Sequence, residues 1–172
     1  MKSPISRTLL VILALIMATI FGCTGTAKPS STERAEALVF YKALNLTYSQ
    51  LQNVMTDWNT WSRTASQAEY DSLILLKSKS YRNQLKMLRD NTAALSAPAK
   101  LQSLKESLIS ALDKGIEVFD LTQQYVQTRQ EADATKVEKS QADYNKLMVI
   151  AAQKWDSGLD YYKIEVGELF SK

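Results

Sequence analysis

The side chains that most often perform catalysis are scarce in this chain. Its 172 residues contain no histidine and one cysteine, Cys23. Without histidine the chain lacks the usual general base near neutral pH and a common ligand of haem and zinc. A single cysteine forms neither an intrachain disulfide nor a cysteine-only metal cage, and no Ser-x-x-Lys pair stands at a recognisable turn. We therefore expect no enzymatic activity, no cofactor and no metal site.

Charged residues form two weaker candidates. Four basic residues share one helical stripe, namely Lys79, Arg82, Lys86 and Arg89. They suit an anionic lipid surface or polymer or, in the interpretation that we favour, ion pairs with acids of a neighbouring helix. Four acidic residues lie near the C-terminus, namely Asp156, Asp160, Glu165 and Glu168. Their spacing does not gather them around a cation, so we expect them to face solvent.

Five aromatic residues are the strongest candidates for binding. In a bundle of helices they fall at a similar height, toward the end far from the N-terminus: Trp58, Trp61, Tyr70, Tyr125 and Tyr144. Indole and phenol groups combine a large apolar surface with a hydrogen-bond donor, so such a cluster suits an apolar or aromatic ligand or a protein partner. The alternative, which we favour, is that these rings fill the core of the bundle.

A repeat of seven residues predicts the elements that carry these side chains. In the first segment one face carries every seventh residue, namely Ala37, Leu44, Leu51, Trp58 and Ala65. This is the pattern of an amphipathic helix. After Pro29 the chain has one further proline, and it has no glycine between Gly25 and Gly115, which is too few turn residues for a β domain. We predict four long helices, at about 31–64, 67–95, 97–130 and 135–170.

Three capping boxes mark predicted helix starts: Ser30-x-x-Glu33, Ser66-x-x-Glu69 and Thr135-x-x-Glu138. The segments between the helices are short, and short connections favour antiparallel neighbours. We therefore predict an all-α domain over residues 31–172, folded as an antiparallel up-down-up-down four-helix bundle. The alternative is a pair of longer coiled hairpins in which adjacent helices are continuous, because the breaks at 63–66 and 130–135 contain neither glycine nor proline.

Small residues recur at core positions of the last two predicted helices: Ala111, Gly115, Ala151 and Gly158. Small side chains at such positions either open a cavity or admit large neighbours. Because protein cores are closely packed, we favour the second interpretation, with Tyr48, Tyr81 and Trp155 as the large neighbours at a comparable height.

The first 23 residues carry the features of a secretory leader. Lys2 and Arg7 precede an apolar run at 9–21. A run of about 13 residues suits the core of a signal peptide, whereas a membrane span needs about 20. The run ends at Ile20-Phe21-Gly22-Cys23, which resembles the lipobox of prokaryotic lipoproteins. This resemblance covers residues 1–23 and implies a signal peptide at 1–22, cleavage before Cys23 and a diacylglyceryl thioether on its sulfur, with fatty acyl chains such as palmitate.

A lipid on Cys23 implies a location as well as a modification. Two or more acyl chains give stable membrane anchoring, and residues 24–30 then form a short tether. We expect a cell-envelope protein that faces the periplasm or the cell exterior, on the outer membrane if the source has two membranes.

The overall charge narrows the choice of partners. The formal charge is +3, from 21 basic and 18 acidic residues, which is too small to indicate nucleic acid. Our first interpretation is a lipid-anchored envelope protein whose bundle is a non-catalytic interaction or scaffold domain, with another envelope protein as its partner. The alternative is a ligand-binding or sensory bundle with an aromatic pocket near the membrane-distal end.

Overall fold

The computed structural model describes residues 28–171 and shows an all-helical protein, as predicted. Over this range long helices are joined by short loops and no strand is present. The long helices are α1 (Ser31–Thr64), α2 (Gln67–Ala94), α3 (Gln102–Thr128) and α4 (Glu131–Tyr162). Short 3-10 helices follow α2 and α4, namely η2 (Ala99–Leu101) and η3 (Val166–Phe170).

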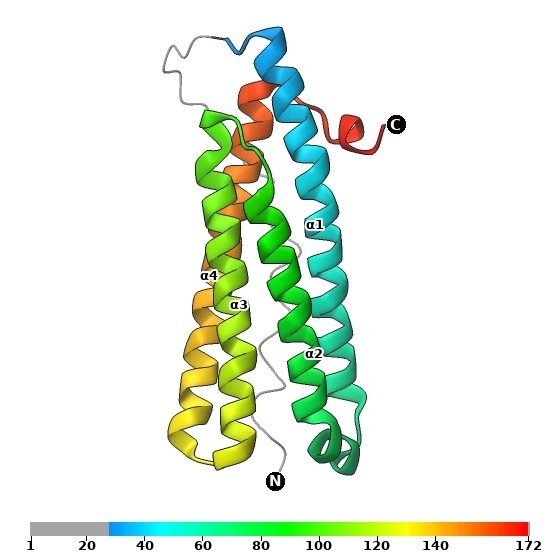
Figure 1. Cartoon of the computed structure of the whole chain (residues 1–172), viewed down its shortest axis with the longest axis vertical. Helices are drawn as coiled ribbons and strands as arrows, with labels where there is room; N and C mark the ends of the chain where they lie inside the picture. The colour runs from blue at the N-terminus through cyan, green and yellow to red at the C-terminus, as the bar shows by residue number, and fades with distance from the viewer. Residues whose placement is uncertain (1–27, 172) are drawn as a thin grey trace.

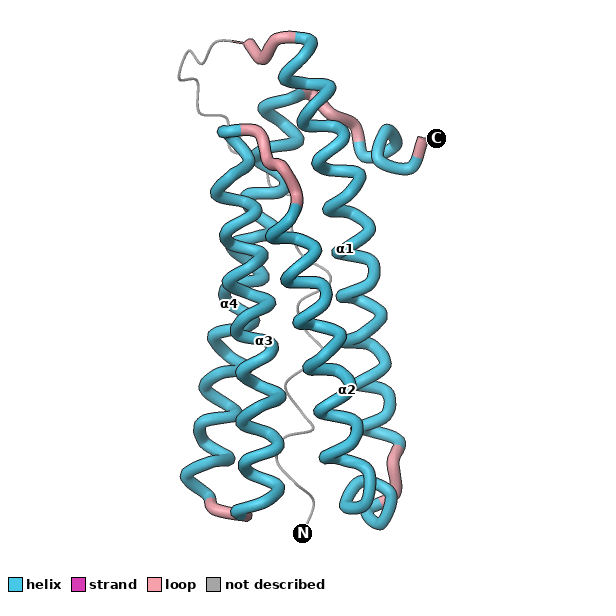
Figure 2. The backbone as a smooth tube through the Cα atoms, viewed as in Figure 1, coloured by secondary structure: helices cyan, strands magenta, loops and turns pink. Residues whose placement is uncertain are grey.

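The four long helices lie side by side in a bundle (Figures 1 and 2). Figure 1 shows the α1–α2 and α3–α4 connections at one end of the molecule and the α2–α3 connection at the other. Close backbone contacts join α1 to α2, α2 to α3, and α3 to α4, whereas α1 and α4 have almost none. The α1–α4 side of the bundle is therefore held by side chains rather than by closely packed backbones.

Two of the three predicted capping boxes start helices in the structure. At α1 the Ser30 hydroxyl accepts from the Glu33 amide (3.1 Å), and the Glu33 carboxylate accepts from the Ser30 amide (2.8 Å). Ser66 and Glu69 repeat this arrangement at α2. Between these two helices Ala65 has a ψ of 134°, so α1 and α2 are separate rather than one continuous helix.

The third capping box, Thr135-x-x-Glu138, does not start a helix. α4 begins earlier, at Glu131, where the buried Asp133 carboxylate accepts from the Thr128 hydroxyl (2.7 Å) and the Gln124 amide (3.0 Å). These bonds tie the first turn of α4 to the end of α3. Thr135 lies inside α4, and its hydroxyl donates to the Glu131 carbonyl (3.2 Å).

The predicted start of the third helix, at 97, and the predicted end of the fourth helix, at 170, are also wrong. The α-helix expected from 97 begins at Gln102, after η2. α4 ends at Tyr162, and Lys163 has a left-handed φ of 53°, after which the chain turns and η3 packs against α1 (Figure 1). Ile164 and Leu169 are buried in the core, so burial of apolar surface stabilises this reversal.

Two buried glycines admit large neighbours into the core. A Cβ atom at Gly158 would collide with the Tyr41 hydroxyl, and one at Gly115 would lie 2.9 Å from Leu85 Cδ1. Small residues therefore admit large neighbours at these two positions, as predicted. The closest neighbours differ from the predicted Tyr48, Tyr81 and Trp155: they are Tyr41 and Leu101 at Gly158, and Leu85 and Tyr144 at Gly115. The same core contains side chains from all four long helices, among them Phe40, Leu44, Leu51, Leu88, Leu108, Leu112, Phe119 and Leu159.

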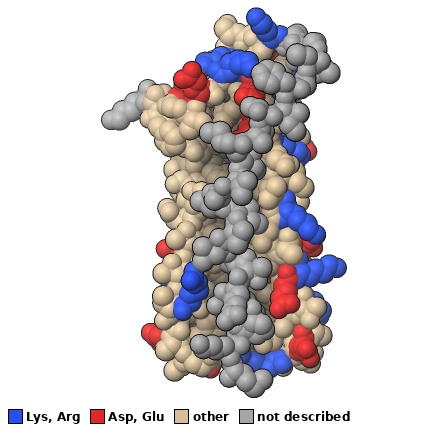
Figure 3. Space-filling model, turned by 180° about the vertical axis from the view of Figure 1, so that it is seen from behind, with Lys and Arg blue, Asp and Glu red and all other residues tan. Residues whose placement is uncertain are grey.

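Two of the four basic residues of the stripe on α2 pair with acidic residues of the neighbouring α3, which is the interpretation that we favoured. Arg82 contacts Asp120 (2.5 Å) and Arg89 contacts Asp113 (3.1 Å), and both acids lie on α3. On the face drawn in Figure 3, basic and acidic side chains of the described residues are interspersed. Of the other two basic residues of the stripe, Lys86 contacts Asp90 of its own helix (3.0 Å), and Lys79 is in no ion pair among the described residues.

The predicted membrane anchor lies outside the described residues, as do the leader and Cys23. Within residues 28–171 no helix combines the length and apolar character needed to cross a bilayer. The same range contains no cluster of three or more histidine, cysteine, aspartate or glutamate residues arranged to hold a metal ion.

Candidate functional site

Three of the five predicted aromatic residues form a continuous set of ring contacts between α1 and α2. Trp61 lies between Trp58 (5.5 Å between ring centroids) and Tyr70 (5.5 Å, stacked within 10° of parallel). Trp58 also meets Phe119 of α3 edge-on at 5.0 Å and Tyr81 of α2 at 5.5 Å. The rings fill the space between these helices by contacting one another, which is the arrangement of an aromatic core.

The other two predicted residues belong to a second group, between α3 and α4. Tyr144 is buried against Val118 and Val137, and Tyr125 packs at the edge of this group. Burial raises the pKa of the Tyr144 phenol above its ordinary range. Burial raises the pKa of the Tyr70 phenol, and the nearby phenol of Tyr125 adds a smaller increase. The two groups are neighbours at this end of the bundle.

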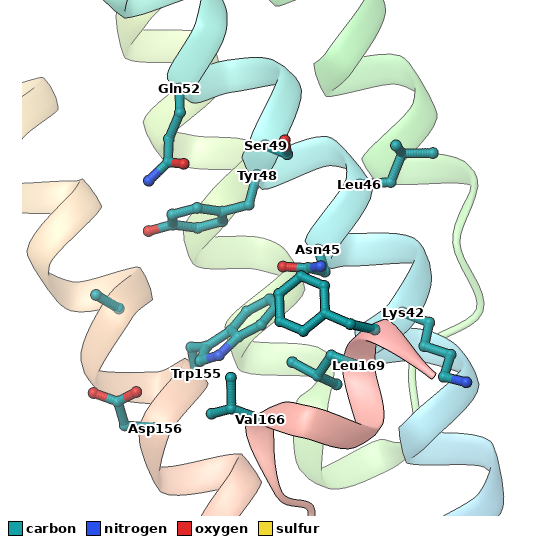
Figure 4. A pocket seen from close by; sticks show the side chains of 12 residues that line it. Lys42, Asn45, Leu46, Tyr48, Ser49, Gln52, Trp155, Asp156, Val166 and Leu169 are labelled. Carbon is teal, nitrogen blue, oxygen red and sulfur yellow. The ribbon is translucent and has the colours of Figure 1, made fainter. Parts of the chain in front are cut away.

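A groove lies elsewhere, between α1, α4 and η3, and has a volume of about 530 Å³ (Figure 4). Most of its lining is aromatic or aliphatic, with a few amide, hydroxyl and charged groups at its margins. The lining residues are Lys42, Asn45, Leu46, Tyr48, Ser49, Gln52, Ala152, Trp155, Asp156, Val166, Leu169 and Phe170. A site of this size and composition resembles the usual small-molecule site in proteins.

Two aromatic contacts with Trp155 connect the helices on either side of the groove. The Trp155 ring meets Tyr41 edge-on at 4.8 Å and Tyr48 at 5.6 Å, tilted by 52°. The Tyr41 hydroxyl also donates to the Trp155 main-chain carbonyl (2.9 Å). Because α1 and α4 have few close backbone contacts, these side chains set their separation and leave the groove open beside Tyr48.

The third wall is η3, which polar contacts fix to α1. The Arg34 guanidinium donates to both carboxylate oxygens of Glu168 (2.7 and 2.9 Å) and to the Lys163 carbonyl (3.0 Å). Lys42 Nζ donates to the Ser171 carbonyl (2.7 Å). The hydrogen bond from Arg34 lowers the pKa of Glu168. Glu168 is therefore not simply a solvent-facing acid, as we expected, but part of a clamp that holds the C-terminal segment.

The margin of the groove near Asp156 carries unpaired negative charge. Neither Asp156 nor Asp160, one turn further along α4, forms an ion pair with any residue in the described range. Partial burial raises the pKa of Asp156, and the charge of Asp160 adds to this effect. Burial raises the pKa of Tyr48, and the charge of Asp156 adds a smaller increase. Asp156 and Asp160 are nevertheless exposed to solvent, as expected, whereas Tyr48 is half-buried.

Sequence reasoning found parts of this groove but not the groove itself. Tyr48 and Trp155 were placed at a comparable height, yet both were assigned to packing around small residues. The wall formed by η3 was missed because residues 163–170 were expected to continue the last helix. The helix ends at Tyr162, followed by the left-handed Lys163, and neither glycine nor proline marks that point; Gly167 lies further on, inside η3.

Comparison with known proteins assigns no family to this chain. No protein-family model, no curated protein and no solved structure matches it.

Proposed function

We propose that this protein is a lipid-anchored cell-envelope protein whose helical bundle binds a small ligand in the groove between α1, α4 and η3, without catalysing a reaction on it. The observation that carries the proposal is the groove itself. Its volume of about 530 Å³ lies within the range of about 300–1,000 Å³ for small-molecule sites. Its lining joins aromatic and aliphatic side chains to a few polar groups, which is how such sites combine affinity with orientation.

The anchor is the second part of the proposal. It rests on the basic residues and apolar run of the leader and on the lipobox-like residues that end at Cys23. We infer that the helices form an antiparallel up-down-up-down bundle, which the short connections and their alternating ends support. In that arrangement Lys42 lies in the half of α1 that is nearer the anchor, and Tyr48 lies at the middle of the helix. The groove then opens between the anchored end and the middle of the bundle rather than at the distal end.

This proposal places the ligand site away from the five aromatic residues that the sequence offered as an alternative pocket near the membrane-distal end. Trp58, Trp61 and Tyr70 contact one another and leave their faces occupied by neighbouring rings. The Trp155 and Tyr48 rings, in contrast, line the groove.

A second candidate function is the binding of another envelope protein, as an interaction or scaffold domain. Four large apolar side chains on α1 and η3 favour it, because each is at least 60% exposed: Val39, Leu46, Val166 and Phe170. Three of the four also line the groove. A protein partner that buries them would cover the opening that a small ligand uses.

The groove proposal is tested by two variants, in each of which phenylalanine replaces an alanine of α4. Thermal unfolding of the purified protein in a non-ionic detergent is recorded with a set of soluble aromatic compounds. A saturating compound at about 100 times its Kd should stabilise the protein by about 2.7 kcal/mol. Ala152→Phe fills the groove and should abolish the stabilisation, whereas Ala142→Phe, at an exposed position outside the groove, should retain it. Equal stabilisation of both variants, or no stabilising compound, contradicts the proposal.

A further inference from the structure

The two sides of the groove differ in charge. On the side formed by α1 and η3 the basic groups are engaged: Lys42 Nζ donates to the Ser171 carbonyl (2.7 Å) and hydroxyl (3.3 Å), and Arg34 is paired with Glu168. Across the groove, on α4, Asp156 has no ion-pair partner among the described residues. The nearest lysine along α4, Lys154, donates to α3 instead, through the Ser107 hydroxyl (2.7 Å). The α1 and η3 side of the groove is thus neutralised, and the α4 side keeps an exposed carboxylate.

Two aromatic rings line the groove together with this carboxylate. The Tyr48 and Trp155 rings are 5.6 Å apart and inclined at 52° to each other, so they form two walls at an angle rather than a closed stack. The face of an aromatic ring carries partial negative charge and attracts cations, most strongly in Trp and Tyr. In Figure 4 the Tyr48 hydroxyl and the Asp156 carboxylate point toward the same side of the groove.

The charged groups around the groove favour a cation over an anion. Asp156 and Asp160, one turn apart on α4, are exposed to solvent and unpaired among the described residues, whereas Lys42, the one lysine in the lining, is engaged with Ser171. A cation at this side therefore meets uncompensated negative charge, and an anion is repelled. The apolar walls formed by Val166 and Leu169 suit the rest of an organic molecule better than a fully hydrated metal ion.

We propose that the groove binds an organic cation, a quaternary or protonated amine on an apolar body, with Asp156 as counter-ion, Tyr48 and Trp155 as ring contacts, and Val166 and Leu169 against the body. This inference rests on the proposed ligand-binding function and names the chemical class of its ligand. The positive group lies between the carboxylate and the two rings, and the apolar body extends toward η3.

The test compares two ligands of the same shape. The cation is benzyl(2-hydroxyethyl)dimethylammonium, and the neutral isostere is 3,3-dimethyl-4-phenylbutan-1-ol, in which carbon replaces the charged nitrogen. Binding of each to the full chain in non-ionic detergent is measured by titration calorimetry. The wild type should bind the cation about tenfold more tightly than the isostere.

Two pairs of variants assign that preference to named groups. Asp156→Asn should reduce it to about threefold or less, and Asp143→Asn, on α4 outside the groove, should leave it unchanged. Tyr48→Phe keeps the ring and should retain the preference, whereas Tyr48→Leu should weaken binding of the cation more than binding of the isostere. Circular dichroism checks that each variant is folded.

Three results overturn the inference, and they differ in what they say about the proposed function. Equal binding of both ligands removes the preference for a cation but leaves a ligand-binding groove. A preference that survives Asp156→Asn places the cation elsewhere. If neither ligand binds, the inference fails, and the broader compound set tested with Ala152→Phe then decides whether the groove binds any ligand.

Discussion

The Tyr41 hydroxyl donates to the main-chain carbonyl of Trp155 at 2.9 Å, and the two rings meet edge-on at 4.8 Å. These residues belong to α1 and α4, the neighbouring helices whose backbones make the fewest close contacts. The pair therefore acts as a spacer: it joins the two helices at one level and leaves the groove beside it. Tyr41 is fully buried, which raises the pKa of its phenol far above the ordinary range and keeps the phenol a hydrogen-bond donor.

Removal of this hydroxyl should weaken the α1–α4 connection without opening the core. Tyr41→Phe keeps the ring contact with Trp155 and loses one hydrogen bond, so we expect a loss of about 1 kcal/mol in the free energy of unfolding. Chemical denaturation measures it. Tyr125→Phe, at a half-buried tyrosine, is the control and should change stability by less than about 0.5 kcal/mol. Equal effects of the two variants would show that the Tyr41 bond contributes nothing specific.

The close approach at Gly158 gives a prediction with a matched control. In Gly158→Ala the new methyl group meets the Tyr41 hydroxyl and Leu101, so the variant should lose about 1–3 kcal/mol of stability, although alanine is otherwise the better helix former. A Cβ at Gly167 has no neighbour within 4 Å, and Gly167→Ala should change stability by less than about 0.5 kcal/mol. Chemical denaturation of the two variants measures these changes in stability. A Gly158→Ala protein that is more stable than the wild type would contradict the prediction.

The aromatic core should respond unequally to loss of its two tryptophans. Trp58 contacts rings from three helices, so Trp58→Ala should cost about 3–5 kcal/mol. Trp61 is half-buried and stacks mainly on Tyr70, so Trp61→Ala should cost about 1–2 kcal/mol. Thermal unfolding measures the loss of stability in each variant, and ligand titration tests whether either variant still binds. Loss of ligand binding in a folded Trp61→Ala protein would indicate that the ligand binds at the aromatic core and not in the groove.

Local signals in the sequence were sufficient for most of the helices. The boxes at Ser30 and Ser66 involve residues three positions apart, so a short stretch of chain determines each start. The box at Thr135 failed because a competing start exists four residues earlier, supported by bonds from Thr128 and Gln124 to Asp133. Those bonds join two helices, and helical periodicity does not reveal them.

The groove required contacts that are distant in sequence. The Arg34–Glu168 pair spans 134 positions, and it fixes η3 where the seven-residue pattern predicted more helix. Leu169 follows Tyr162 by seven residues, and both are buried although the chain is no longer an α-helix at Leu169. Periodicity indicates which face of a helix is buried, but the distance between α1 and α4 depends on the side chains that meet there.

Acid should release the C-terminal segment. The pKa of Glu168 is lowered in the folded protein, so its contribution to stability is fully present above the ordinary glutamate pKa of about 4.3 and is lost as the pH falls through the lower folded value. Hydrogen exchange at Leu169 and Phe170 should therefore accelerate below about pH 4. Glu168→Gln should show fast exchange already at neutral pH. Exchange that is independent of pH in the wild type, after correction for the intrinsic rate, would argue against the clamp.

The anchor depends on a single thiol. Cys23→Ala should abolish incorporation of a radioactive fatty acid and move the protein to the aqueous phase of a detergent partition, because the chain has no second cysteine. Label retained on the variant, or a wild type found in the aqueous phase, would remove the lipoprotein interpretation.

The position of the ligand site is the central claim, and the three tryptophans report on it directly. Trp155 lines the groove, whereas Trp58 and Trp61 belong to the aromatic core. The indole N–H resonances, assigned from single Trp→Phe variants, are followed by NMR during titration with benzyl(2-hydroxyethyl)dimethylammonium. We predict a saturable shift of the Trp155 resonance, with Trp58 and Trp61 unchanged. A shift of Trp58 or Trp61 with Trp155 unmoved would contradict the account.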